Sequence, residues 1–123
     1  MVGVPLRYVS PDGALIFIVA NHDGDLALGF EGYPWHTHGD ILAAVSGLPI
    51  SEAVKQFIEA LLNGEAVVAV ASVDGVVQDV WIADRPIEPD RYKPENETIV
   101  YRLWDGSVRW VDGPSTTPPT PFR

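Results

Sequence analysis

The stretch AVVAVASVDGVVQDVWIA, residues 66–83, carries two runs rich in valine that flank the pair Asp74-Gly75. Valine and isoleucine pack well in strands, and Asp-Gly suits the tight turn of a hairpin because both residues tolerate positive φ. The stretch therefore predicts a β-hairpin in which residues 66–73 pair with residues 76–83.

Four further Asp-Gly pairs lie at residues 12–13, 23–24, 105–106 and 112–113. Two of them separate strand-like runs and predict hairpins that pair 14–20 with 26–30 and 98–104 with 107–111. The first of these hairpins turns across residues 21–25, so its turn is expected to be longer than two residues. With an edge strand at residues 4–9, the pattern predicts an antiparallel sheet of about six to seven strands built from β-hairpins.

The hydrophobic period changes between the first two hairpins. Residues 51–63 carry apolar side chains at helical spacing. Ser51 is placed as an N-cap, and Gly64 follows as a helix stop. The spacing predicts a helix over 51–63 that packs on one face of the sheet.

A second, shorter helix is predicted over residues 38–46. Thr37 and Asp40 have the spacing of a capping box, and Gly47 is placed to end the helix. Its apolar face is expected to come from Ile41, Leu42 and Val45. One short and one longer helix, inserted between the first and second hairpins, make the predicted fold class α+β.

Length and proline content predict how the chain is organised. A chain of 123 residues suits one domain, which we expect to span residues 1–112. Residues 85–96 contain three prolines among charged residues and predict an extended connection. Residues 113–123 contain four prolines and predict an extended, polyproline-like C-terminal tail.

Charge and composition exclude several classes of function. Seventeen acidic residues against eight basic ones give a net charge of −9, which repels nucleic acid and anionic lipid and attracts a basic protein. The longest apolar run, residues 14–20, is far shorter than the about 20 residues of a membrane span. Arg7 and Asp12 interrupt any secretory signal, so we expect a cytoplasmic protein. Without cysteine there is no thiolate nucleophile, and we expect no cofactor.

The histidines concentrate the chemistry of the sequence between His22 and Asp40. If the backbone is extended at His36 and His38, their imidazoles point to one side and could bind a divalent metal with Asp40 or Asp23. If His38 instead begins a helix, that shared geometry is lost. No serine lies in a nucleophile elbow, so we predict no catalytic residue and favour a protein that is not an enzyme.

Trp35 follows Pro34 in a segment without periodicity, which predicts a partly exposed ring. Exposed tryptophan beside histidine and acidic residues is typical of protein-binding hot spots. The predicted binding surface consists of Asp23, Asp25, Glu31, Tyr33, Trp35, His36, His38 and Asp40.

The overall make-up, together with the segment GFEGYPWHTHGD at residues 29–40, resembles the immunity proteins of bacterial toxin systems. The resemblance implies a cytoplasmic protein that binds and neutralises a cognate toxin, with a basic toxin domain as partner, and it transfers no residue roles. Two alternatives stay open. One is a small metal-dependent hydrolase that uses His36 and His38 with an aspartate; the other is a non-catalytic ligand-binding or accessory subunit with an apolar cleft between helices and sheet.

Overall fold

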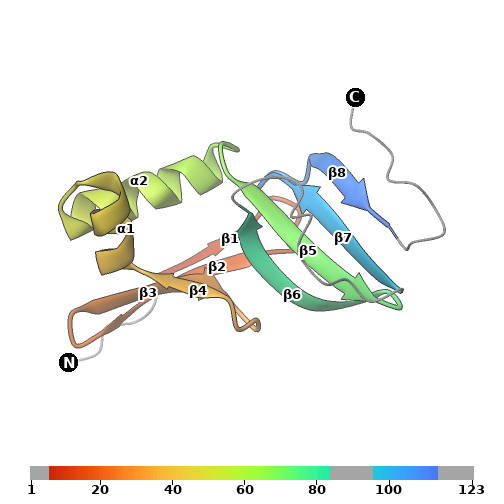
Figure 1. Ribbon diagram of the computed structural model, residues 1–123, viewed down its shortest axis with the longest axis horizontal. Helices are drawn as coiled ribbons and strands as arrows, with labels where there is room; N and C mark the ends of the chain where they lie inside the picture. The colour runs from red at the N-terminus through yellow and green to blue at the C-terminus, as the bar shows by residue number, and fades with distance from the viewer. Residues whose placement is uncertain (1–5, 84–95, 114–123) are drawn as a thin grey trace.

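The computed structural model describes residues 6–83 and 96–113, and within them the chain has the predicted α+β class. The elements are β1 (Leu6–Val9), β2 (Ile16–His22), β3 (Asp25–Phe30), β4 (His36–His38), α1 (Gly39–Ser46), α2 (Ile50–Leu62), β5 (Val67–Val73), β6 (Val76–Ala83), β7 (Glu97–Arg102) and β8 (Val108–Asp112) (Figure 1). Apart from Asn96 and Gly113, the predicted connection and C-terminal tail lie outside the described residues.

The strands form two four-stranded antiparallel sheets, ordered β1-β2-β3-β4 and β6-β5-β7-β8, which we call the first and second sheets. The expectation of one sheet of six to seven strands was wrong in this respect. Packing two sheets against each other buries an apolar face of each, which a single open sheet does not achieve. The helices lie over the first sheet, away from β7 and β8 (Figure 1).

Two of the predicted hairpins close on two-residue turns. In the β5–β6 hairpin Val73 pairs with Val76 across Asp74-Gly75, as predicted. The β2–β3 hairpin is tighter than predicted, because His22 pairs with Asp25 and leaves only Asp23-Gly24 in the turn. Asp23 and Gly24 have φ of 55° and 90°, the left-handed conformation that suits this short turn.

The β7–β8 hairpin has a longer turn than the other two. Predicted strand residues 103–104 lie in the connection, where the Leu103 N–H donates to the Ser107 carbonyl at 2.9 Å. The register shifts between Tyr101 and Arg102, so a bulge precedes this turn. The predicted edge strand is present as β1 over its described residues.

Glycines end both helices as predicted, but the starts differ from the predictions. Gly47 and Gly64 have φ of 76° and 77°. The predicted capping box does not form: Thr37 is extended in β4, and Asp40 Oδ1 accepts from the N–H of its neighbour Ile41 at 2.9 Å. The N-cap of α2 is Pro49, so the predicted N-cap Ser51 is the second residue of the helix.

One core joins the two sheets to α2. Phe17 and Leu28 of the first sheet, Leu61 of α2 and Val68 of the second sheet have no exposed surface. A second cluster lies on the opposite face of the second sheet and includes Tyr101, which is 2 % exposed. Because α2 contributes to the same core as both sheets, it fixes the helical end of the molecule against them.

An ion pair ties the β1–β2 turn to the end of β7. The guanidinium of Arg102 donates to Asp12 through two nitrogens, at 2.7 and 3.1 Å, and also donates to the carbonyls of Leu103 and Trp104. Hydrogen bonds from Arg102 and then from Ser10 hold the pKa of Asp12 well below its ordinary value. This pair links the first sheet to the second.

Candidate functional site

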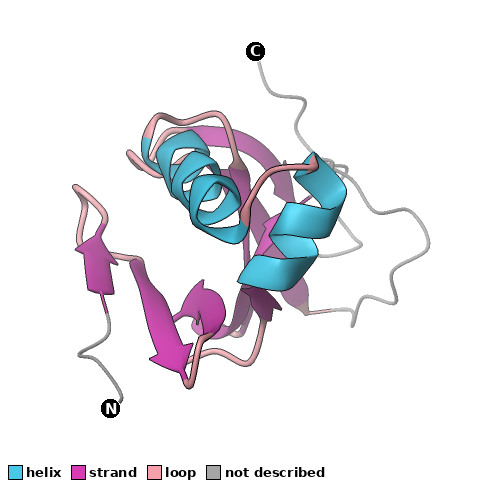
Figure 2. Cartoon of the chain, turned by 90° about the vertical axis from the view of Figure 1, so that its left-hand side faces the viewer, coloured by secondary structure: helices cyan, strands magenta, loops and turns pink. Residues whose placement is uncertain are grey.

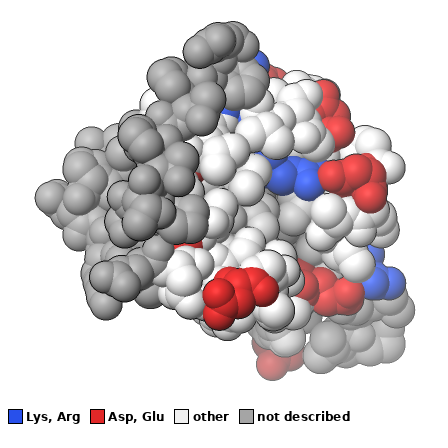
Figure 3. All heavy atoms as spheres, turned by 90° about the vertical axis from the view of Figure 1, so that its right-hand side faces the viewer, with Lys and Arg blue, Asp and Glu red and all other residues white. Residues whose placement is uncertain are grey.

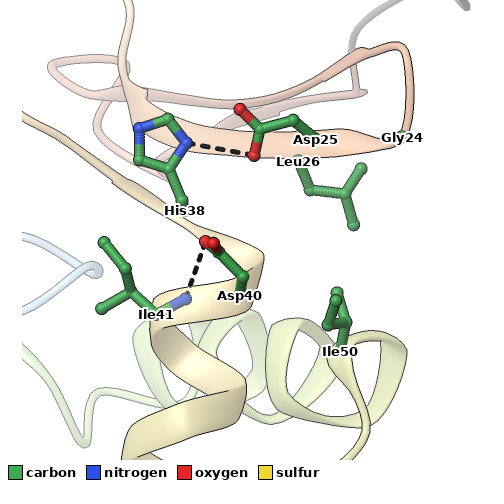
Figure 4. Close-up of a pocket in the computed structure, with 7 residues that line it drawn as sticks. All are labelled: Gly24, Asp25, Leu26, His38, Asp40, Ile41 and Ile50. Atoms are coloured by element: carbon green, nitrogen blue, oxygen red, sulfur yellow. Dashed lines mark hydrogen bonds and ion pairs between the residues drawn. The ribbon is translucent and has the colours of Figure 1, made fainter.

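A pocket of about 470 Å³ lies where the β2–β3 turn faces the start of both helices. Figure 4 shows its seven lining residues, which come from the β2–β3 turn, β3, the end of β4 and the first turns of α1 and α2. They are Gly24, Asp25, Leu26, His38, Asp40, Ile41 and Ile50. The β2–β3 turn and the Gly39 junction between β4 and α1 therefore build the site.

Gly39 allows the helices to approach the first sheet closely at this site. It is buried, and a Cβ at this position would lie 2.9 Å from Ile50 Cγ2 and 3.2 Å from Val54 Cγ2. A larger residue would therefore push α2 away from the β4–α1 junction. The absence of a side chain at Gly39 is what lets Ile50 reach the pocket wall.

His38 and Asp25 form the polar side of the pocket. His38 pairs with Ala27 across the β3–β4 ladder, and Asp25 lies two positions from Ala27 on the same face of β3. His38 Nδ1 lies 3.2 Å from Asp25 Oδ1, as the dashed line in Figure 4 shows. Both side chains are solvent-accessible, at 32 % and 55 % respectively, so the ion pair remains available to another molecule.

The prediction that extended backbone would place His36 and His38 on one side is confirmed. Both residues belong to β4, and their ring centroids are 5.0 Å apart with an angle of 79° between the planes. Each ring already contacts a protein oxygen through Nδ1, since His36 Nδ1 lies 3.0 Å from the Pro34 carbonyl. The pair forms a small imidazole cluster beside the pocket.

The predicted metal ligands do not meet as a set. Within residues 6–83 and 96–113, no group of three or more histidine, aspartate or glutamate side chains is placed to hold a metal ion. Asp40 Oδ1 is engaged with the Ile41 N–H, whereas the ring of His38 points toward Asp25 (Figure 4). Among the described residues the metal alternative therefore has two adjacent imidazoles, while Asp25 pairs with His38 and no set of three ligands is formed.

Exposed apolar side chains lie next to these polar groups. Ile41 and Val45, one helical turn apart on α1, are 50 % and 84 % exposed, and Ile50 at the start of α2 is 43 % exposed. A shallow groove between the helices, lined in part by Leu42, Val45 and Phe57, continues this surface. Figure 2 shows the two helices side by side at this end of the molecule. Of the predicted apolar face of α1, only Leu42 packs on the core, whereas Ile41 and Val45 are exposed.

The structure divides the predicted binding surface in two. Asp25, His36, His38 and Asp40 lie at or beside the pocket, and Asp23 lies in the turn next to Gly24. The remaining three residues lie in the β3–β4 connection. Glu31 pairs there with Arg7 at 2.9 Å, and Tyr33 and Trp35 are half-buried against the core.

Trp35 packs as part of the structure. Its ring centroid lies 6.2 Å from that of Phe30, and the side chain contacts the hydrophobic clusters on both faces of the second sheet. The predicted partial exposure is confirmed, but these contacts assign Trp35 to holding the β3–β4 connection in place. The apolar part of the site comes instead from Ile41, Val45 and Ile50, which the predicted binding surface left out. For Ile41 and Val45, the signal that could have found them was an eight-residue helix too rich in apolar residues for one buried stripe.

The opposite end of the molecule has a different surface. Figure 3 shows acidic and basic side chains interspersed among uncharged ones on the described part of that face. At the pocket, by contrast, the charged lining residues are Asp25 and Asp40, with His38 between them. The negative charge at this end is therefore not balanced by a lysine or arginine among the described lining residues.

No family model matches the chain, and neither a search of curated proteins nor a search of solved structures found a similar protein. Within the described residues no single helix has the length and hydropathy to cross a membrane; α1 and α2 reach them only together, with a 90° bend between them.

Proposed function

We propose that the protein is a non-catalytic binding protein that captures a basic partner protein with its helical end. The observation that carries the proposal is the exposed apolar surface of Ile41, Val45 and Ile50 flanked by the carboxylates of Asp25 and Asp40. An apolar centre with a charged rim is the usual anatomy of a protein interface. Apolar contacts supply affinity there, and the rim sets orientation and choice of partner.

The charge of the chain supports a basic partner. The chain carries a net charge of −9, and Asp25 and Asp40 place negative charge at the pocket itself. Such a surface attracts a cationic protein over roughly a Debye length of about 8 Å at physiological ionic strength and repels nucleic acid and anionic membranes. Binding should therefore become faster as ionic strength falls.

In this role the protein acts in the cytoplasm as an immunity protein that neutralises a cognate bacterial toxin. The resemblance in overall make-up, the acidity and the small size support this assignment. An inhibitor of this kind needs a rigid surface and no reaction chemistry of its own. The surface proposed here is anchored because Leu42 of α1 and the apolar face of α2 pack in the core that joins both sheets.

The decisive experiment is co-expression with a toxin encoded directly beside this gene. Wild-type protein should restore growth and bind the purified toxin domain, with affinity that falls as salt rises. The Asp25→Asn/Asp40→Asn and Val45→Ser variants should each bind about tenfold more weakly or worse, equivalent to about 1.4 kcal/mol. A neighbourhood without a toxin gene, or protection that survives both variants, would contradict the proposal.

Matched control variants lie in the second sheet. Asp74 occupies the same turn position as Asp23, with φ of 52° against 55°, and Val76 is an exposed valine on β6. Asp74→Asn removes one of the two charges that the double variant removes, and Val76→Ser repeats the Val45→Ser substitution at an exposed valine, both away from the pocket. Both should bind the toxin as tightly as wild type.

The adjacent imidazoles of His36 and His38 favour one rival, the metal-dependent hydrolase. Metal analysis of the purified protein separates the two functions. Stoichiometric zinc, manganese or iron that disappears in the His36→Ala/His38→Ala variant would favour the hydrolase. A metal-free protein with full toxin binding would favour the binding protein.

A further inference from the structure

A second cavity, with a volume of about 210 Å³, lies between the two sheets and away from the pocket at the helices. Leu15 and Tyr33 form part of one wall, on the side of the first sheet, and Val70, Val80 and Val100 form the wall on the second sheet. We propose that this cavity binds a small, neutral, apolar molecule of about the size of a monocyclic aromatic compound. The proposal is independent of the binding surface at the helices.

The valine wall is a continuous row across three strands. Val70 of β5 pairs with Val80 of β6 on one side and with Val100 of β7 on the other, so the three side chains project from the same face of the sheet. Val80 is buried at 1 % exposure, whereas Val70 and Val100 are only half-buried. The two sheets therefore leave apolar surface uncovered at a place where sheet packing usually fills the space.

A bulge in β6 shapes the mouth of the cavity. The register between β5 and β6 shifts after the pair Ala71 and Asp79, so that the next pair is Ser72 with Val77. The extra residue turns Val77 to the same face as Val70, and Val77 lines the cavity at 37 % exposure. Opposite it, Ala14 contributes only a methyl group to the lining.

The lining chemistry favours a neutral ligand. Arg102 is the one charged side chain among the described lining residues, and each of its three guanidinium nitrogens already donates to Asp12, to Leu103 or to Trp104. An anionic ligand would have to compete with Asp12 for that guanidinium. A cationic ligand would meet the charge of Arg102 and, apart from Tyr33, only apolar side chains. Burial of either ion would lack a compensating partner.

Volume sets the size of the ligand. An engineered apolar cavity of about 150 Å³ in another protein is large enough to hold benzene. A cavity of about 210 Å³ thus accommodates a single aromatic ring with a short substituent. The sequence analysis named an apolar cleft between helices and sheet as the mark of a ligand-binding protein; the apolar cavity found here lies between the sheets instead.

Three probes of one ring size test the proposal by amide chemical shifts of the labelled full-length protein. Toluene should shift the amides of Tyr33, Val70 and Val100 saturably, with a dissociation constant of about 1 mM or tighter. Benzoate and benzylamine should bind at least tenfold more weakly. No localised shifts up to the solubility limit of toluene, or equal binding of all three probes, would overturn the proposal.

Two variants locate the site. Val77→Phe fills the mouth and should weaken toluene binding at least tenfold, whereas Val76→Phe adds the same ring on the other face of β6 and should leave binding unchanged. If Val77→Phe does not fold, Ala14→Leu fills the cavity from its exposed opposite wall and should have the same effect. Loss of binding in the Val76 variant, or full binding in the filled ones, would place toluene elsewhere and refute the assignment.

Discussion

Two aspartates flank β2, Asp12 in the β1–β2 turn and Asp25 at the start of β3, and the basic side chains that they contact differ in their surroundings. Asp12 holds Arg102, whose side chain is 8 % exposed, with a shortest contact of 2.7 Å. Asp25 holds His38 at 3.2 Å, and that imidazole is 32 % exposed. A buried guanidinium needs its counter-charge, whereas an exposed imidazole exchanges its partner for water at little cost. The first pair therefore serves the fold, and the second leaves a carboxylate free to meet a partner.

The largest loss of stability should come from removing the buried guanidinium of Arg102. Arg102→Ala leaves the carbonyls of Leu103 and Trp104 without this donor and breaks the link to Asp12, at a cost of about 3 kcal/mol in the free energy of unfolding. Urea denaturation followed by tryptophan fluorescence measures it. Arg102→Met restores the apolar stem and should recover only part of the loss. A change below about 1 kcal/mol would show that the link is not structural.

A smaller effect should follow from crowding β3 against β4, the strand that carries His38. A Cβ on Gly29 would lie 2.7 Å from the Trp35 carbonyl oxygen and 3.3 Å from His36 Cβ. Gly29→Ala should cost about 2 kcal/mol and shift the amide resonances of β4. The control Gly113→Ala adds a Cβ with nothing within 4 Å and should leave stability unchanged. Equal stability of the two variants would mean that β4 moves without penalty.

The next effect in size should be the pH dependence of stability that comes from the pair of Asp12 with Arg102. The pKa of Asp12 lies below its ordinary value of about 3.9, so the unfolded chain takes up the proton first as pH falls. The contribution of Asp12 is thus complete above about pH 5 and is lost as pH falls below about 4. Because its carboxylate is more than one third exposed, we expect about 1–2 kcal/mol.

The Asp12→Ala variant supplies the comparison for this titration. Its stability should lie below that of wild type at neutral pH, and the two curves should converge as the pH approaches 2. Curves that stay parallel over this range would mean that protonation of Asp12 does not weaken the link to Arg102.

The smallest loss of stability should come from a substitution at the pocket. His38→Gln removes the exposed pair with Asp25 and should change the free energy of unfolding by less than about 0.5 kcal/mol. Under the proposed function it should still alter binding of the toxin domain, because His38 lines the pocket. A loss of more than about 1.5 kcal/mol would show that this end, too, is built for stability.

Local patterns in the sequence predicted the hairpins and helices well. The hairpin at 66–83 follows from valine runs around Asp-Gly, and the ends of both helices follow from Gly47 and Gly64. These features depend on neighbouring residues and on backbone geometry. The division into two sheets does not, because hairpins specify local pairs and leave the pairing of β5 with β7 to tertiary packing.

The site was predicted only in part, again because local sequence patterns do not specify which elements pack together. Alternation along an extended strand correctly placed His36 and His38 on one side. Whether Trp35 packs inward or Ile41 faces solvent depends on which elements lie above them, and single-sequence periodicity does not contain that information. The Asp12 to Arg102 pair spans 90 residues and has no local signature.

The claim that the Asp12 pair stabilises the fold and the Asp25 pair does not is tested most directly by making the same isosteric substitution at both aspartates. Asp12→Asn and Asp25→Asn remove the same charge without changing side-chain volume, and urea denaturation at pH 7 gives the free energy of unfolding of each. We predict a loss of about 1–2 kcal/mol for Asp12→Asn and less than about 0.5 kcal/mol for Asp25→Asn. Equal losses, or a larger loss at Asp25, would contradict the claim that Asp12 stabilises the fold whereas the pocket carboxylate of Asp25 contributes little to stability and is available for binding.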